Sequence, residues 1–134
     1  MAIYNLDTSI WLDYYEKRGN NGVNALKLIL KIIKDKSMVI YSDLHIKELK
    51  DLGYNLGEIN ILLRIVKPDN LRRVHISREQ KEEATLLAYN RDIPRGDALH
   101  AILARDNNSI MVSRDMHFKR LLDVVKTKRP EELF

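Results

Sequence analysis

Short apolar runs alternate along the chain with longer segments in which apolar residues recur every three or four positions. The short runs are rich in Ile, Val and Leu and predict five strands, at residues 3–6, 38–41, 73–76, 110–113 and 124–126. Strands this short and this apolar are typical of a sheet that is buried on both faces. The alternation therefore predicts an α/β fold, in which a parallel β-sheet is sandwiched by helices in a three-layer α/β/α arrangement.

The longer segments carry signals for where helices begin and end. They predict six helices, at residues 9–18, 23–34, 42–52, 56–67, 77–88 and 97–106. Gly19 is expected to end the first helix, while Ser42 and Ser77 are placed to cap the third and the fifth. The last helix, with the sequence DALHAILARD, is apolar on nearly every side, so we expect it to pack deep inside the protein.

Length and composition narrow the class of protein. The chain has 134 residues, a length usual for one compact domain, so we expect residues 1–134 to form a single domain. It has no cysteine, which excludes disulfides, zinc–thiolate sites and thiol nucleophiles. The first residues do not resemble a signal peptide, and no uncharged apolar stretch is long enough to span a membrane. We therefore expect a soluble, cytoplasmic protein without a membrane partner.

The net charge at pH 7 is +4, and the basic residues are clustered. They gather at residues 27–36, at Arg72 and Arg73, and in the segment 114–129. Such an excess is compatible with a nucleic-acid ligand. Because Lys and Arg also solvate ordinary helix faces, the charge supports this interpretation without establishing it.

Two acidic residues directly follow predicted strands. Asp7 comes after the strand at 3–6, and Asp115 comes after the strand at 110–113, separated from it by Arg114. Parallel strands end at the same edge of their sheet, and open α/β sheets bind ligands at that edge. We therefore expect the two carboxylates to lie at the ligand-binding edge.

Two further acids lie on predicted helix faces that point inward. On a helical wheel, Glu48 falls between Leu44 and Leu52, in the middle of an apolar stripe. Asp97 occupies the first turn of the most apolar helix. Because burial of an unpaired charge is costly, each carboxylate needs a cation, a hydrogen-bond donor or a raised pKa.

Each of these acids also has an explanation that needs no ligand. Asp7, Asp97 and Asp115 are placed where they could cap a helix or favour its dipole, and Glu48 could pair with a Lys or Arg. Convergence of all four is harder to explain in this way, because carboxylates that approach one another repel. Mg²⁺ or Mn²⁺ removes that repulsion and prefers oxygen ligands. The four acids together therefore predict a metal site.

A metal site of this kind suits the hydrolysis of phosphodiesters, because the cation activates a water molecule and neutralises the phosphate. Asp7, Glu48, Asp97 and Asp115 are then both metal ligands and catalytic residues. Ser9 and Ser113 lie beside two of these acids and are candidates to orient ligands or water molecules.

The order and spacing of these residues resemble the PIN-domain family, and within it the VapC-type toxins. The segment LDTSIWLD is similar to the first motif of the family, and SDLHIKELKDL is similar to the second, with its helical acid at Glu48. The segment GDALHAILARDNNSIMVSRDMHF resembles the third and fourth motifs together, and RPEELF resembles the usual C-terminal segment. The resemblance covers nearly the whole chain.

This resemblance implies a metal-dependent endoribonuclease that uses Mg²⁺ or Mn²⁺ to cleave RNA. It further implies the toxin of a type II toxin–antitoxin pair, often a homodimer, inhibited by a cognate antitoxin protein. Two alternatives stay open, a housekeeping RNA-processing nuclease and a PIN-like module that binds RNA or protein without catalysis. A phosphatase of the aspartyl-phosphate type is disfavoured because Ser9 stands where it needs a second acid, and no glycine-rich turn indicates dinucleotide binding.

One position departs from the family pattern. Many relatives carry a further acid two residues after the Asp of the fourth motif, and this chain has His117 there. An imidazole can bind Mn²⁺ or contact a phosphate, but a partly exposed histidine without a metal role is also compatible with the sequence. His100 follows Asp97 by one helical turn and could approach the site, whereas His45 and His75 complete no zinc-binding spacing.

Overall fold

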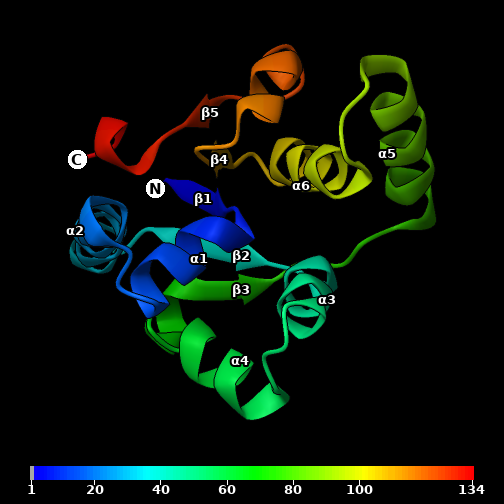
Figure 1. Ribbon diagram of the computed structural model, residues 1–134. Coiled ribbons are helices and arrows are strands. Elements are labelled where there is room, and N and C mark those ends of the chain that lie inside the picture. The colour runs from blue at the N-terminus through cyan, green and yellow to red at the C-terminus, as the bar shows by residue number, and fades with distance from the viewer. Residues whose placement is uncertain (1) are drawn as a thin grey trace.

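A computed structural model describes residues 2–134, and its centre is a parallel sheet (Figure 1). Its strands are β1 Ile3–Leu6, β2 Met38–Tyr41, β3 Leu71–Arg73, β4 Ile110–Val112 and β5 Thr127–Lys128. They are arranged in the order β3-β2-β1-β4-β5, and every neighbouring pair is parallel. The chain thus builds the sheet outward from β1, first on one side and then on the other.

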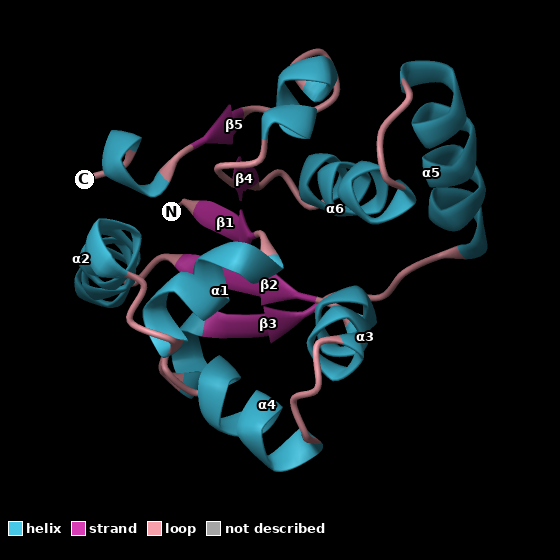
Figure 2. Ribbon diagram, viewed as in Figure 1, coloured by secondary structure: helices cyan, strands magenta, loops and turns pink. Residues whose placement is uncertain are grey.

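Helices cover both faces of the sheet (Figure 2). They are α1 Thr8–Tyr15, α2 Gly19–Asp35, α3 Asp43–Asp51, α4 Leu56–Leu63, α5 Arg78–Arg91 and α6 Arg95–Asp106, with the 3-10 turns η1 Pro68–Asn70, η2 Met116–Leu121 and η3 Pro130–Glu132. Helices α1, α2 and α4 pack on one face and α5 and α6 on the other, which confirms the predicted α/β/α fold. Within residues 2–134, no helix has the length and apolar character that a membrane crossing requires.

The alternation of side chains along the strands divides the interior into two cores. Leu6 of β1 packs with Trp11 on the α1 side of the sheet, while Met111 of β4 packs with Phe118 on the α6 side. Every residue of α6 from 98 to 104 is buried, as its apolar sequence predicted. Because α6 is buried over this length, the position of its first turn is fixed, and that turn carries Asp97.

The third strand lies two residues earlier than predicted, at Leu71–Arg73 instead of 73–76. The side chain of Asn70 donates a hydrogen bond to the carbonyl oxygen of Ser37 at 2.9 Å, and this places Leu71 opposite Val39 of β2. Beyond β3 the chain crosses to the other layer, where Ile76 packs against the second core. Val74 still donates its backbone N–H to the carbonyl oxygen of Tyr41 at 2.8 Å, and Ile76 beyond it belongs to the crossing to α5.

The fifth strand is also misplaced in the prediction, which put it at 124–126, whereas the structure has it at Thr127–Lys128. The backbone N–H groups of Val124 and Val125 both donate to the carbonyl oxygen of Leu121, so these residues form a turn. Val125 packs into the second core from that turn. Its apolar character reflects core packing and not strand pairing.

The expectation that Gly19 ends the first helix is wrong. Helix α1 ends at Tyr15, and Gly19 begins α2 with a φ of +57°, a conformation that favours glycine. Gly22 allows the two helices to approach, since a Cβ there would lie 2.7 Å from the carbonyl oxygen of Asp13. The cap predictions are confirmed, because Ser42 caps α3 and Ser77 caps α5.

Candidate functional site

The candidate site lies at the carboxyl ends of β1 and β4, where the strand order reverses direction. Asp7 follows β1 and is nearly fully buried. Its Oδ2 accepts hydrogen bonds from Ser113 Oγ at 2.9 Å and from Ser9 Oγ at 3.1 Å. Burial raises the pKa of Asp7, and these hydrogen bonds offset only part of the effect.

Glu48 reaches the same edge from the middle of α3. Its Oε1 accepts hydrogen bonds from Thr8 Oγ1 at 2.7 Å and from His100 Nε2 at 2.6 Å. Burial alone would raise the pKa of Glu48, but the hydrogen bond and the charge of His100 hold it below its ordinary value. A Cβ at Gly96 would lie 3.1 Å from Oε2, so the glycine leaves room for this carboxylate beside the start of α6.

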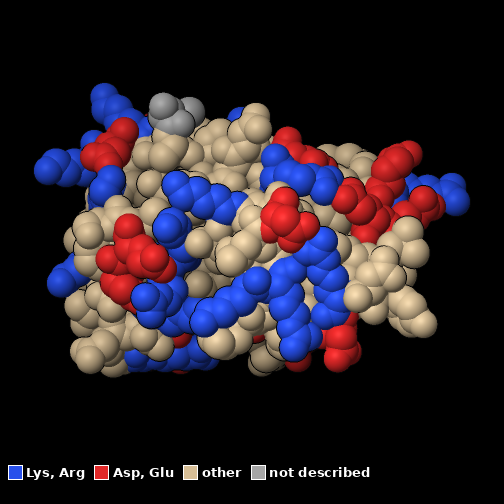
Figure 3. Space-filling model, turned by 90° about the horizontal axis from the view of Figure 1, so that it is seen from above, with Lys and Arg blue, Asp and Glu red and all other residues tan. Residues whose placement is uncertain are grey.

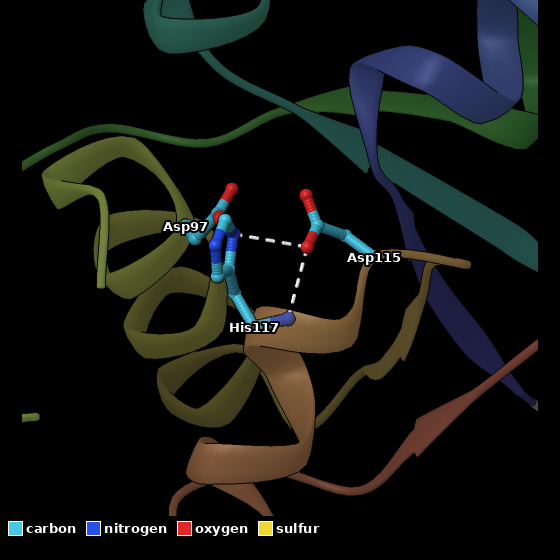
Figure 4. A group of neighbouring side chains, drawn as sticks. All are labelled: Asp97, Asp115 and His117. Carbon is cyan, nitrogen blue, oxygen red and sulfur yellow. Dashed lines mark hydrogen bonds and ion pairs between the residues drawn. The ribbon is translucent and has the colours of Figure 1, made fainter. Parts of the chain in front are cut away.

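Asp97, Asp115 and His117 form a compact group at the other side of the site (Figure 4). His117 Nδ1 lies 2.9 Å from Asp97 Oδ2 and 2.9 Å from Asp115 Oδ1. One ligand atom from each of the three residues lies within 4.8 Å of the other two. Burial, followed by the charges of Asp7 and Asp115, raises the pKa of Asp97 to about 6.

All four predicted acids face this one edge, although they are not equally close to one another. The Asp7 carboxylate interacts electrostatically with Glu48 and Asp97, and Asp97 in turn with Asp115. Within residues 2–134, the tight group is limited to Asp97, Asp115 and His117, so Asp7 and Glu48 lie around it and not in it. His117 is partly exposed, as expected, but it contacts two of the acids.

In each of the four acids, the described residues form hydrogen bonds to one carboxylate oxygen and leave the other without one. The engaged oxygens are Asp7 Oδ2, Glu48 Oε1, Asp97 Oδ2 and Asp115 Oδ1. No hydrogen bond among residues 2–134 reaches the second oxygen of any of the four. Carboxylate oxygens with one histidine nitrogen form a donor set that Mg²⁺ and Mn²⁺ accept, so the residues present fit a divalent cation.

The alternatives that need no ligand account for these acids only in part. Asp7 lies at the N-terminus of α1 without a side-chain capping bond, whereas Asp115 does cap η2 through the backbone N–H of His117. Glu48 pairs with a histidine and, among residues 2–134, with no Lys or Arg. Asp97 lies in the first turn of α6 and makes no capping bond.

Sequence reasoning missed Thr8 as a donor to Glu48, and of His100 it predicted only that this residue could approach the site. Thr8 follows Asp7 directly, and His100 lies one helical turn after Asp97, so each belongs to a segment that already carried a site residue. Adjacency to the acids was the available signal, but nothing in the sequence indicated that Thr8 and His100 meet at Glu48.

Two cavities open beside the acids. One, of about 420 Å³, is lined by residues that include Asp115, Lys119, Lys128 and Arg129. The other, of about 470 Å³, lies between α1 and α3 and includes Glu48 in its lining. The group of Asp7, Glu48, Asp97 and Asp115, here called the acidic centre, is therefore bordered by two cavities. The cavity beside Asp115 is also lined by basic side chains, and the other lies beside Glu48.

Known protein families and solved structures include matches to the sequence and to the fold of this chain. A sequence description of the PIN domain matches residues 4–123, while no curated protein matches the chain. The structure is similar to VapBC2 from Rickettsia felis bound to a DNA fragment from its promoter, with a TM-score of 0.67, 21% identity and coverage of 95% of this chain and 98% of that one.

Two other solved structures have the same fold. VapBC-1 from nontypeable Haemophilus influenzae gives a TM-score of 0.67 at 15% identity, covering 96% of this chain and 98% of that one. FitAcB from Neisseria gonorrhoeae gives a TM-score of 0.61 at 17% identity, covering 97% of this chain and 99% of that one. Because the family match spans most of the sequence and the fold agrees, the chain belongs to the PIN domain family.

Proposed function

We propose that this protein is an endoribonuclease that uses Mg²⁺ or Mn²⁺ to hydrolyse phosphodiester bonds in RNA. The observation that carries the proposal is the set of four acids at the strand-order reversal of a PIN domain, each with one oxygen that has no hydrogen-bond partner in the described part of the chain. Asp7, Glu48, Asp97 and Asp115 are assigned as metal ligands and catalytic residues, with His117 beside them.

When bound, a divalent cation supplies Lewis acidity toward the phosphate and lowers the pKa of a water molecule. The protein holds the ligands in place. Ser9 and Ser113 fix the orientation of the Asp7 carboxylate through Oδ2, and Ser113 Oγ also accepts the backbone N–H of Asp115 at 3.0 Å. Ser113 therefore couples the positions of two acids whose strands are neighbours in the sheet.

The basic cavity beside Asp115 supports RNA as the substrate. Lys and Arg side chains form a band across the middle of the face that carries η2 and β5, interrupted by acidic side chains (Figure 3). Lys119, Lys128 and Arg129 line the cavity next to Asp115. A phosphate chain that crosses this cavity brings its negative charge past basic groups before it reaches the acids, which on their own would repel it.

The direct test is an RNA cleavage assay on mixed single-stranded and structured substrates. Purified protein is incubated with Mg²⁺, with Mn²⁺, or with EDTA followed by re-addition of Mn²⁺. Cleavage that depends on the metal and returns on re-addition supports the proposal. RNA binding without cleavage under every metal condition would favour a non-catalytic binding module instead.

Replacement of a basic residue in the cavity should weaken RNA binding. Lys119 is exposed, lines the cavity and makes no ion pair within the part of the chain that the structure describes. In Lys119→Glu, the affinity for a single-stranded RNA should fall, and the slope of log affinity against log salt should decrease by about 0.7 or more. Fluorescence anisotropy over a salt series measures both quantities.

Lys34→Glu is the matched control, because it makes the same change of charge at an exposed position of α2 that does not line the cavity. It should leave the salt slope close to that of the wild type. Equal slopes for wild type and Lys119→Glu would show that the cavity does not bind the RNA backbone.

We further propose that the nuclease acts as the toxin of a type II pair and that an antitoxin protein binds it. The support is the likeness to structures described as VapBC, together with the resemblance of the motifs that carry the four acids to those of VapC-type toxins. A housekeeping RNA-processing nuclease would have the same site without a dedicated partner. A small antitoxin gene next to the gene for this chain would distinguish the two.

Expression of the chain alone should slow bacterial growth, and Asp97→Asn should relieve the effect, because that change removes a proposed metal ligand. Growth curves after induction, with equal protein levels confirmed by immunoblot, measure the difference. If both proteins inhibit growth equally, the inhibition does not come from nuclease activity.

A further inference from the structure

His100 is fully buried in α6, and its ring contacts the carboxylate of Glu48. Its Nε2 is 2.6 Å from Glu48 Oε1, across the contact between α6 and α3. An ionised carboxylate only accepts hydrogen bonds, so Nε2 carries the proton and donates it. The backbone carbonyl of His100 accepts a hydrogen bond from Asn5 Nδ2 at 3.0 Å, which ties this turn of α6 to β1 just before Asp7.

A second buried histidine supports the ring of His100. The ring centroids of His45 and His100 are 4.5 Å apart, with the planes inclined by 54°. His45 Nδ1 accepts the backbone N–H of Ser42, and its Nε2 lies 2.7 Å from the carbonyl oxygen of Leu6. Because one nitrogen accepts and the other donates, the hydrogen bonds fix His45 as a neutral ring in one orientation.

The two donors to Glu48 meet at the same oxygen. His100 Nε2 and Thr8 Oγ1 both bond to Oε1, while Oε2 has no partner within residues 2–134 and lies beside Gly96 at the start of α6. Two donors that converge on one oxygen restrict rotation of the carboxylate about its terminal torsion. They also determine which oxygen is left to bind a ligand.

We propose that His100 is a positioning residue that holds Glu48 so that Oε2 faces the acidic centre and can bind a cation. The inference deepens the proposed function and depends on it, since it assigns how one of the four ligands is oriented. Partners of metal ligands typically change metal affinity by about 10–100-fold when they are removed. His100 can hold this carboxylate in one orientation because its own ring is completely buried.

The test compares His100→Gln with His100→Asn. The amide nitrogen of Gln is four bonds from Cα, as is Nε2 of histidine, so it can still donate to Oε1; the amide nitrogen of Asn is one bond shorter and cannot reach it. We expect the Asn variant to bind Mn²⁺ about tenfold or more weakly, and the Gln variant to stay close to the wild type. Isothermal titration calorimetry with Mn²⁺ alone measures this without reference to activity.

Ile102→Val is the control for loss of stability. Ile102 is buried in the same helix, belongs to the second core and is an apolar side chain that cannot bind a cation, so its truncation should lower the melting temperature without changing Mn²⁺ affinity. A structural role for His100 would make both of its variants less stable and leave their Mn²⁺ affinities equal to each other.

The outcomes separate this inference from the proposed function. If wild type binds Mn²⁺ and cleaves RNA but the Asn and Gln variants bind Mn²⁺ equally, the role of His100 is refuted and the nuclease proposal stands. If wild type neither binds Mn²⁺ nor cleaves RNA, the two proposals fail together. Weaker Mn²⁺ binding by His100→Asn, together with Mn²⁺ binding by His100→Gln that is close to the wild type, supports the inference.

Discussion

An Asp7→Asn or an Asp97→Asn protein is expected to keep its fold and to cleave RNA about a thousandfold more slowly than the wild type. The amide removes a negative charge and weakens an oxygen ligand of the proposed cation. Charge stabilisation by a metal contributes several kcal/mol to phosphoryl chemistry, and about 4 kcal/mol corresponds to a factor of about 10³ in rate. Single-turnover cleavage of a fluorescent RNA at saturating Mn²⁺ measures the rate, and circular dichroism reports the fold.

Asp35→Asn is the matched control for these variants. Asp35 is an exposed carboxylate at the end of α2 that pairs with Lys31 at 2.6 Å, and it lies outside the acidic centre. Exposed pairs of this kind contribute little to stability, so both fold and cleavage should stay near those of the wild type. Undiminished cleavage by a folded Asp7→Asn or Asp97→Asn protein would refute the assignment of that residue.

Without metal, Asp97→Asn should melt at a higher temperature than the wild type. The Asp97 side chain is only 14% exposed, and the charges of Asp7 and Asp115 act on it. Neutralisation removes this repulsion, which should raise the free energy of unfolding by about 1 kcal/mol if the hydrogen bond to His117 is kept. Thermal melts in EDTA measure the change.

The same melts repeated in millimolar Mn²⁺ should reverse the order of the two proteins. A ligand that binds only the folded state stabilises it by RT ln(1 + [L]/Kd), so the wild type gains more than the variant. If Asp97 only favours the helix dipole, the variant instead melts lower in EDTA and Mn²⁺ has no effect on the wild type. That pair of results would contradict the metal site.

The pH dependence of thermal stability without metal independently checks whether Asp97→Asn raises or lowers stability. Because burial and neighbouring charges raise the pKa of Asp97 from 3.8 to about 6, the folded protein binds more protons than the unfolded chain between these values. The contribution of Asp97 to stability is therefore present below pH 3.8 and is lost as the pH rises through 6. The stability advantage of Asp97→Asn should accordingly be larger at pH 7 than at pH 4.

The amino-acid sequence by itself determined the layers of the fold and the two strand ends that are followed by site acids. Asp7 and Asp115 follow β1 and β4 as predicted, because short apolar runs leave few alternatives to a buried parallel strand. The apolar residues of α6 likewise left its deep burial as the only favourable arrangement. Local signals were sufficient wherever one periodicity dominated a segment.

The same local signals failed for β3, β5 and Gly19. Apolar residues at Val74 and Val125 pack into the protein from a crossing segment and from a turn, and their hydrophobicity alone cannot distinguish these settings from a strand. Leu52, predicted on the buried stripe of Glu48, is exposed because α3 ends before it. Burial depends on what lies opposite a residue, which the local sequence does not contain.

Only the tertiary structure decided how the acids are held. Ser113 reaches Asp7 across 106 residues of sequence, and His100 reaches Glu48 across 52. These contacts exist because neighbouring strands and packed helices bring distant segments within hydrogen-bond distance, and a hydrogen bond is lost within a few tenths of an ångström. Residue types and spacing fix which groups can donate or accept, whereas the packing of α3 against α6 fixes which of them meet.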